Sequence, residues 1–200
     1  MKQLVIILVL VMGNLSCFSQ DMKLPAPKKT GGKPLMNALN ERQSNREFSD
    51  KELSLQTLSD LLWAANGFNR EDKRTAPSSQ DRQELDLYVF LKTGVYFYDA
   101  KNQQLILKVQ GNHQAKTGGQ PFVAVAPLNI VFVANLDKAS NRDAALIDSG
   151  FISQNVYLFC ASEGLISVVR GSVDKTTVHN LLGLSEKQEV LLAQTVGYKQ

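Results

Sequence analysis

The sequence predicts a single α+β domain in which helices pack on a mixed or antiparallel sheet. Three observations predict this class. Strand-like and helical segments alternate without a regular βαβ rhythm, three β-rich segments follow one another between residues 85 and 109, and a strongly apolar helical run lies at 150–163. The chain has 200 residues, of which 44% are apolar and 20% charged. That length suits one core, and that composition is typical of a globular protein.

The first 19 residues predict an export signal. A positive start is followed by an uninterrupted apolar run at 4–12, which is short for a bilayer span but typical of a secretory signal. Small residues at Cys17 and Ser19 place the expected cleavage after Ser19, so the mature chain would be periplasmic or secreted. Cys17 also allows a lipoprotein signal, with the lipid on that cysteine. No stable transmembrane segment is expected after cleavage.

Residues 20–34 contain three prolines, two glycines and four lysines, and they predict a flexible N-terminal strap on the surface or an exposed tether. The domain is expected to span 35–200 and to begin with a short helix at 35–42. Ser54 is a suitable N-cap for a helix at 55–66, where leucines recur at helical spacing, and Gly67 is placed to end it.

The rest of the chain predicts most of the sheet and three helices. Residues 67–84 are polar and irregular, and a stretch of that length in a compact domain is usually functional or mobile. Strands are expected at 85–91, 95–98, 105–109, 129–134, 165–169 and 190–198. Helices are expected at 138–148, 150–163 and 175–182. The helix at 150–163 is apolar on nearly every side, so it should be central or face another subunit.

Charge and composition exclude several function classes. The formal net charge is only +3 and no run of lysine or arginine is present, so a nucleic-acid partner is not expected. Two cysteines and two histidines are too few for a zinc site or a disulfide framework. Cys160 is expected to be a buried small hydrophobe. His113 and His179 lie in polar segments without catalytic partners, so no acid/base residue is predicted.

One candidate binding segment has two arginines around a serine. In an extended or turn conformation Arg42, Ser44 and Arg46 would project to one side and offer forked donors and a hydroxyl, which suits a phosphate dianion and its adjoining polyol. The alternative is a solvated surface in which the arginines pair with Glu41 or Glu47.

Two further segments suit a flat ligand. Residues 74–83 form a proline-stiffened loop of short hydrogen-bonding side chains, which can contact the polar edge of a heterocycle. Residues 164–171 place a short strand between glycines, and Gly171 lets the backbone approach a ligand closely. A plain surface turn and a buried strand with turn glycines are the respective alternatives.

These segments resemble the FMN-dependent nitroreductase family, and within it the azoline-dehydrogenase (SagB-like) branch. RQSNREF at 42–48 matches the family's opening pattern of alternating arginine and serine. The likeness covers residue 35 to the C-terminus, in the expected order, through LLWAANG (61–67), RTAPSS (74–79), YVF (88–90), GVYFYD (94–99), DSGFISQNVYLFCASEGLISVVRG (148–171) and QTVGY (194–198).

The resemblance implies an obligate homodimer that holds FMN in clefts between the two copies. The reaction would be reduction of nitroaromatic or quinone acceptors, or dehydrogenation of a heterocycle, with NAD(P)H as the family's usual electron donor. The implied cofactor-binding residues form three sets. These are Arg42, Ser44 and Arg46, with Gln43 through its backbone, for the phosphate and ribityl chain; Pro77, Ser78, Ser79 and Gln83 along the isoalloxazine; and Val168, Val169, Arg170 and Gly171 beside the ring.

Three positions depart from the family pattern. Asp81 stands where asparagine is frequent, and an acceptor-only carboxylate near the flavin would alter its redox poise unless it points away. Arg170 stands where many relatives are uncharged or acidic, and a guanidinium beside the ring would favour anionic reduced flavin. Lys199 alone remains to replace a basic tail. NAD(P)H is scarce outside the cytoplasm, so the electron donor of an exported member stays open. The alternative function is a non-catalytic flavin-binding or dimeric scaffold in which Arg170 or the loop at 111–120 closes the edge above the ring, and a protein without flavin is a third.

Overall fold

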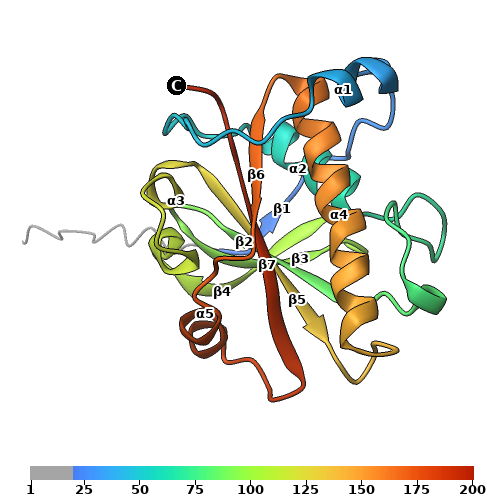
Figure 1. The fold of residues 1–200 in the computed structure, drawn as a ribbon, viewed down its shortest axis with the longest axis vertical. Coiled ribbons are helices and arrows are strands. Elements are labelled where there is room, and N and C mark those ends of the chain that lie inside the picture. The colour runs from blue at the N-terminus through green and yellow to red at the C-terminus, as the bar shows by residue number, and fades with distance from the viewer. Residues whose placement is uncertain (1–19) are drawn as a thin grey trace, which may run out of the picture.

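The computed structural model describes residues 20–200 and has one seven-stranded sheet at its centre (Figure 1). The strand order is β1-β4-β3-β2-β5-β7-β6, and neighbouring strands are antiparallel throughout. The α+β class with an antiparallel sheet is therefore confirmed. The strands are β1 (Met22–Lys23), β2 (Leu85–Phe90), β3 (Gly94–Asp99), β4 (Gln104–Gln110), β5 (Leu128–Asn135), β6 (Ile166–Arg170) and β7 (Gln188–Gly197). The predicted signal at 1–19 lies outside the described residues.

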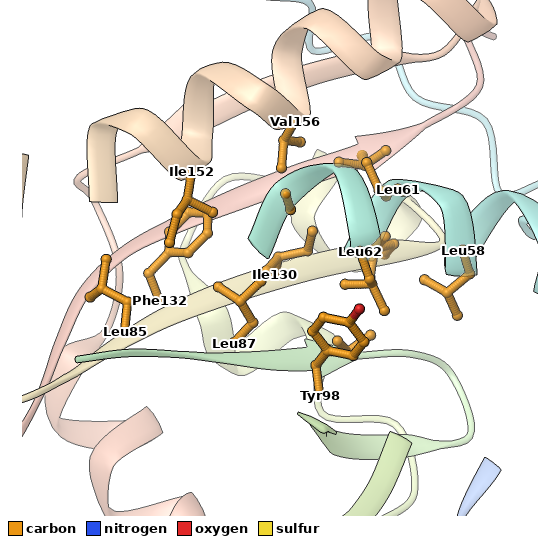
Figure 2. Close-up of a cluster of buried hydrophobic side chains, with 14 of the residues drawn as sticks. Leu58, Leu61, Leu62, Leu85, Leu87, Tyr98, Ile130, Phe132, Ile152 and Val156 are labelled. Atoms are coloured by element: carbon orange, nitrogen blue, oxygen red, sulfur yellow. The ribbon is translucent and has the colours of Figure 1, made fainter. Parts of the chain in front are cut away.

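Helices cover both faces of the sheet. They are α1 (Leu35–Glu41), α2 (Leu55–Asn66), α3 (Phe122–Val125), α4 (Arg142–Glu163) and α5 (Lys175–Leu182), with short 3-10 turns η1 (Ser79–Asp81) and η2 (Gln114–Thr117). The side chains of α2 and α4 pack on one face, where Leu61, Leu62 and Val156 contact the core around Ile130 (Figure 2). On the other face α5 contributes Val178 to a smaller cluster.

The longest helix is one element where the sequence predicted two. The expected helices at 138–148 and 150–163 are joined in α4, which begins after its N-cap Asn141 and ends at Gly164 in a left-handed conformation. Gly150 lies within it, on an exposed position with open space beside its Cα. A glycine inside a helix costs only about 1 kcal/mol relative to alanine, and burial of Ile152 and Val156 offsets that cost.

The first described residues lie along the outer edge of the sheet. Met22 and Lys23 pair with the outer edge of β4, and the backbone N–H of Leu107 donates to Asp21 Oδ1 at 2.8 Å. Leu24 is only 3% exposed, because it reaches into the main core. The strand pairing, which proline-rich composition did not indicate, covers an edge that would otherwise expose unpaired backbone groups. Within residues 20–200, no helix has the length and apolarity needed to span a membrane.

Candidate functional site

The segment that follows α1 is held against the edge strand β6 and the end of the chain (Figure 1). Ser44 forms a parallel bridge with Ser167, and the backbone N–H of Asn45 donates to the carbonyl of Ser167 at 3.1 Å. The N–H of Ser49 donates to the carbonyl of Tyr198 at 2.9 Å. The predicted phosphate-binding segment is thus fixed by backbone hydrogen bonds, which leaves its side chains available.

The two arginines of this segment have no carboxylate partner among residues 20–200. Glu41 pairs with Lys33 at 2.5 Å, and Glu47 lies 3.9 Å from the ammonium group of Lys199. Arg42 instead places its guanidinium carbon 5.2 Å from the ring centre of Tyr157, and Arg46 is exposed. The alternative interpretation, in which Arg42 and Arg46 pair with Glu41 or Glu47, therefore disagrees with the structure.

Tyr157 joins this segment to β6, a role that sequence reasoning missed. It projects from α4, and its hydroxyl lies 2.8 Å from the hydroxyl of Ser44. The backbone N–H of Val169 donates to the same phenol oxygen at 2.8 Å. Two of the three predicted sets, the residues around Ser44 and those around Val169, are thereby brought together. The only sequence signal for this role is a tyrosine, an aromatic residue with a polar hydroxyl, within a strongly apolar helix.

A hollow opens beside these residues. It has a volume of about 480 Å³, and its walls include Arg42, Gln43, Tyr157, Ser167 and Lys199. Lys199, the one residue expected to replace a basic tail, therefore lines the same hollow as Arg42. The hollow has room for a polar group such as a phosphate.

The side chain of Arg170 does not lie at the exposed surface of β6. The residue is 5% exposed, and its guanidinium donates to Thr195 Oγ1 at 3.1 Å, to Asn129 Oδ1 at 3.2 Å and to the carbonyl of Thr117 at 3.0 Å. Burial lowers the pKa of Arg170 to about 10. Its charge therefore ties η2 to β5 and β7, so any contact with a ligand at this position would be made by the backbone.

Gly118 makes this arrangement possible. A Cβ atom at position 118 would collide with the Nη1 atom of Arg170 and crowd the carbonyl of Ser172. Gly171, which the sequence assigned to close ligand approach, is exposed and has open space beside its Cα. The backbone at the end of β6 is thus accessible from outside.

The third predicted set lies in a loop around η1 whose polar groups satisfy one another. Arg74 Nε donates to Gln83 Oε1 at 3.0 Å, and Gln83 Nε2 donates to the carbonyl of Asp72 at 2.7 Å. The backbone N–H of Gln83 donates to Ser78 Oγ at 3.0 Å. The amide of Gln83, expected to contact flavin, is therefore used within the loop, while Pro77 is exposed.

This loop has an uncommon backbone conformation. Gln80, Asp81 and Gln83 have φ values of 53°, 56° and 49°, in the left-handed region that residues with a side chain rarely adopt. Such conformations persist only where the surrounding structure enforces them, and they gather at binding sites. Asp81 itself pairs with Lys73 at 2.5 Å, and this hydrogen bond holds the pKa of the carboxyl below its usual range. The negative charge of Asp81 is therefore neutralised by the positive charge of Lys73.

A pair of buried carboxyl groups anchors the same loop. The backbone N–H of Ser79 donates to Asp148 Oδ2 at 2.7 Å. Glu84 is 2% exposed, and its carboxyl oxygens have no hydrogen-bond donor among residues 20–200. Burial, followed by the neighbouring Asp148, raises the pKa of Glu84. The loop is thus fastened to α4 next to a carboxyl group that favours its neutral form.

The predicted sets attach to different sides of α4. Asp148 holds the η1 loop and Tyr157 holds the segment around Ser44, and these two anchors lie nine positions apart in the helix. At 3.6 residues per turn, that is roughly two and a half turns, or about 13 Å along the axis, with the side chains on opposite faces. Figure 1 shows the segment after α1 and the segment after α2 on the two sides of α4. One chain therefore does not bring all three sets together.

One further reactive group, the thiol of Cys160, lies in the wall of the hollow next to Arg42. Cys160 is buried and free, as predicted, and burial raises the pKa of its thiol. Within the part of the chain that the structure describes, no group of three or more histidine, cysteine, aspartate or glutamate side chains could hold a metal ion.

Comparison with known proteins agrees with the fold and with the sequence resemblance. The sequence profile of the nitroreductase family matches residues 39–198. A candidate nitroreductase of Methanocaldococcus jannaschii is 30% identical over 182 residues, which cover 82% of this chain and 91% of that protein. The crystal structure of a candidate nitroreductase from Ralstonia eutropha is 39% identical, with a TM-score of 0.85 and coverage of 91% of this chain and 90% of that one.

A more distant neighbour shows the fold alone. An FMN-dependent nitroreductase from Clostridium difficile has a TM-score of 0.60 at 20% identity, over 82% of this chain and 87% of that one. Taken with the antiparallel sheet, the covering helices and the ordered motifs, the profile match and the relative from Methanocaldococcus jannaschii establish that this chain belongs to the nitroreductase family.

Proposed function

We propose that this protein is an FMN-dependent oxidoreductase whose flavin site is assembled from two copies of the chain. One observation carries the proposal. Arg42 and Arg46 have no carboxylate partner among residues 20–200, because the adjacent glutamates pair with lysines. Two unpaired guanidiniums on either side of an exposed serine hydroxyl suit a phosphate dianion, to which arginine donates in a forked geometry.

The residues present fit a phosphorylated flavin. Arg42, Ser44 and Arg46 would hold the phosphate and ribityl chain, and the hollow of about 480 Å³ next to Arg42 has room for the phosphate. The backbone at Val169 and Gly171 would lie along the ring. Bound FMN would supply hydride or electron transfer, and the protein would supply binding and orientation.

The remaining wall would come from the η1 loop of a second copy. Two helices expose apolar side chains that a homodimer would cover: Ile147 and Phe151 on α4, which are 61% and 43% exposed, and Leu35, Met36 and Leu39 on α1. Exposed apolar side chains that gather into a patch mark protein interfaces. Because α4 lies between the two anchoring points, pairing of two chains along α4 would bring the η1 loop of one copy toward the arginines of the other.

Mixed dimers test this arrangement. One variant carries Arg42→Ala with Arg46→Ala, and the other carries Pro77→Glu, which places a carboxylate on an exposed position of the η1 loop. Each variant alone should bind FMN weakly. Each site would take its arginines from one copy and its η1 loop from the other. In a co-expressed heterodimer all the substitutions would therefore lie in one site and none in the other, so the expected stoichiometry is one FMN per dimer. Heterodimers without a tight site would show that the η1 loop does not act across the interface.

The proposed reaction is reduction of a nitro or quinone-type acceptor, or dehydrogenation of a heterocycle as in the azoline-dehydrogenase branch, with NAD(P)H as the candidate electron donor. Purified protein should take up added FMN and show visible flavin absorbance. After reduction by dithionite, the holoprotein should be reoxidised by a nitroaromatic or a quinone faster than free reduced FMN is. Flavin binding without such acceleration would instead identify a non-catalytic flavin-binding scaffold.

We further propose that the protein is exported and acts in the periplasm or outside the cell. The apolar run at 4–12 and the small residues at Cys17 and Ser19 support this location. Mass spectrometry of protein recovered from the native compartment should give a chain that begins at Gln20. A lipid-modified N-terminus at Cys17 would identify the anchored form, and an intact Met1 in the cytoplasmic fraction would contradict export.

A further inference from the structure

Tyr157 occupies an unusual position between the two ligand-facing segments of one chain. The residue is 6% exposed, and its ring lies under the guanidinium of Arg42. Its hydroxyl is 2.8 Å from the backbone nitrogen of Val169 and 2.8 Å from Ser44 Oγ. No other tyrosine hydroxyl among residues 20–200 is hydrogen-bonded to the segment around Ser44.

One arrangement of protons gives every donor among these groups an acceptor. A backbone N–H can only donate, so the phenol oxygen accepts from Val169. The phenol proton is then available for Ser44 Oγ, which is its other neighbour. A serine hydroxyl that accepts this proton keeps its own proton for a further partner. Ser44 is exposed and has no second hydrogen-bond partner among residues 20–200, so its proton is directed to whatever binds there.

Such a chain strengthens the last donor. Each hydrogen bond polarises the next, and the effect is larger where surrounding protein excludes water, as it does around the nearly buried Tyr157. An anion gains more from a polarised donor than a neutral group does, because charge-assisted hydrogen bonds are the stronger ones. The phosphate of FMN would benefit, and the terminal hydroxyl of riboflavin would benefit little.

We infer that Tyr157 is a positioning residue that orients the Ser44 hydroxyl as a donor and thereby makes the site selective for the phosphorylated flavin over riboflavin. This inference rests on the proposed function, since it concerns the same site. The inference adds Tyr157, a residue on α4, to the proposed site. Tyr157 would set the preference between FMN and riboflavin, which differ only in a phosphate group, without contacting the ligand itself.

The test compares binding of FMN and of riboflavin by fluorescence titration. Tyr157→Phe keeps the ring beneath Arg42 and removes only the hydroxyl. We expect FMN affinity to fall by about tenfold, while riboflavin affinity changes by less than about twofold. Ser44→Ala should produce the same selective loss, and the double variant should be no worse than Ser44→Ala alone, because both substitutions break one chain.

Tyr98→Phe is the matched control. Tyr98 is also a buried tyrosine, and its hydroxyl donates to Gln103 Oε1 at 3.0 Å, so neither residue of this hydrogen bond belongs to β6 or to the segment around Ser44. This variant should leave the ratio of FMN to riboflavin affinity unchanged. Incorporation of 3-fluorotyrosine at position 157 provides a second variant that keeps both hydrogen bonds. The fluorine makes the phenol a stronger donor, so FMN affinity should rise and riboflavin affinity should stay constant.

The outcomes separate the inference from the function on which it rests. Equal loss of both flavins in Tyr157→Phe, or no change in their ratio, would overturn the inference, because a residue that merely supports the fold does not distinguish them. An additive double variant would also overturn it. A parent protein that binds neither flavin would overturn the proposed function itself.

Discussion

The segment around Ser44 and the η1 loop lie on either side of α4, and they differ in whether their polar side chains already have partners within the chain. Around Ser44 the backbone is hydrogen-bonded to Ser167 and Tyr198, while Arg42 and Arg46 have no carboxylate partner among residues 20–200. In the η1 loop the side chains of Arg74, Ser78 and Gln83 hydrogen-bond to other groups of the same loop. A region with free charges can supply binding energy directly, whereas a region with satisfied polar groups supplies shape. We therefore expect removal of polar side-chain groups to change affinity in the first region and stability in the second.

The largest effect is expected from the arginines. Replacing Arg42 and Arg46 together with alanine should weaken FMN binding by about 1.5–3 kcal/mol for each charge-assisted interaction. Fluorescence titration measures this loss. Arg142→Ala is the control, because Arg142 is exposed and already pairs with Glu189, and it should leave FMN affinity unchanged. Unchanged affinity in the double variant would show that residues 42–46 do not bind the phosphate.

A smaller effect, of another kind, is expected from Gln83. Gln83→Leu removes the acceptor for Arg74 Nε and the donor to the carbonyl of Asp72. Because partly buried polar groups lose their partners, the free energy of unfolding should fall by about 1–3 kcal/mol. Chemical denaturation with and without FMN measures it. If Gln83→Leu lost FMN affinity at unchanged stability, the amide would contact the ligand, and the contrast between the two regions would fail.

The smallest effect is a dependence of stability on pH. Burial and Asp148 raise the pKa of Glu84 above its ordinary value of 4.5, whereas Arg82 acts in the opposite direction. The folded protein therefore holds a proton that the unfolded chain releases, so stability is greatest below pH 4.5 for this group and is lost as pH rises through the folded pKa. Glu84→Gln should flatten that part of the profile of unfolding free energy against pH.

The control for that measurement is Glu186→Gln, since Glu186 is exposed in a turn outside the η1 loop. It should leave the profile unchanged. A Glu84→Gln profile with the parent's slope would mean that Glu84 is ionised in the folded protein, and its carboxylate would then need a cationic partner in solution.

The sequence predicted those elements whose signals are local. The helix at Leu55–Asn66 is bounded by Ser54 and Gly67 as expected, since a cap and a period are properties of neighbouring residues. The strand at Met22–Lys23 was missed because only pairing with β4 creates it. The break expected at Gly150 was wrong because contacts with the sheet outweigh the local propensity of one glycine.

The same distinction applies to the candidate site. The alternation of Arg42, Ser44 and Arg46 indicated a common segment, which the structure has. Sequence alone could not place Tyr157 beside Ser44, since 113 positions separate them and the contact depends on how α4 lies against β6. Nor could it show that Arg170 points into the protein, because its partners come from η2, β5 and β7.

The close approach of Arg170 to Gly118 has an evolutionary consequence. Any side chain at position 118 would occupy the space of the guanidinium, so the two positions are not free to vary independently. A guanidinium held at this place requires glycine at 118, whereas a short residue at 170 removes that collision and leaves only the close contact with Gln120 and the carbonyl of Ser172. Substitutions at these positions should therefore be correlated across descendants of a common ancestor, and a lineage that retains Arg170 with a bulky residue at 118 must hold either the guanidinium or this loop in another place.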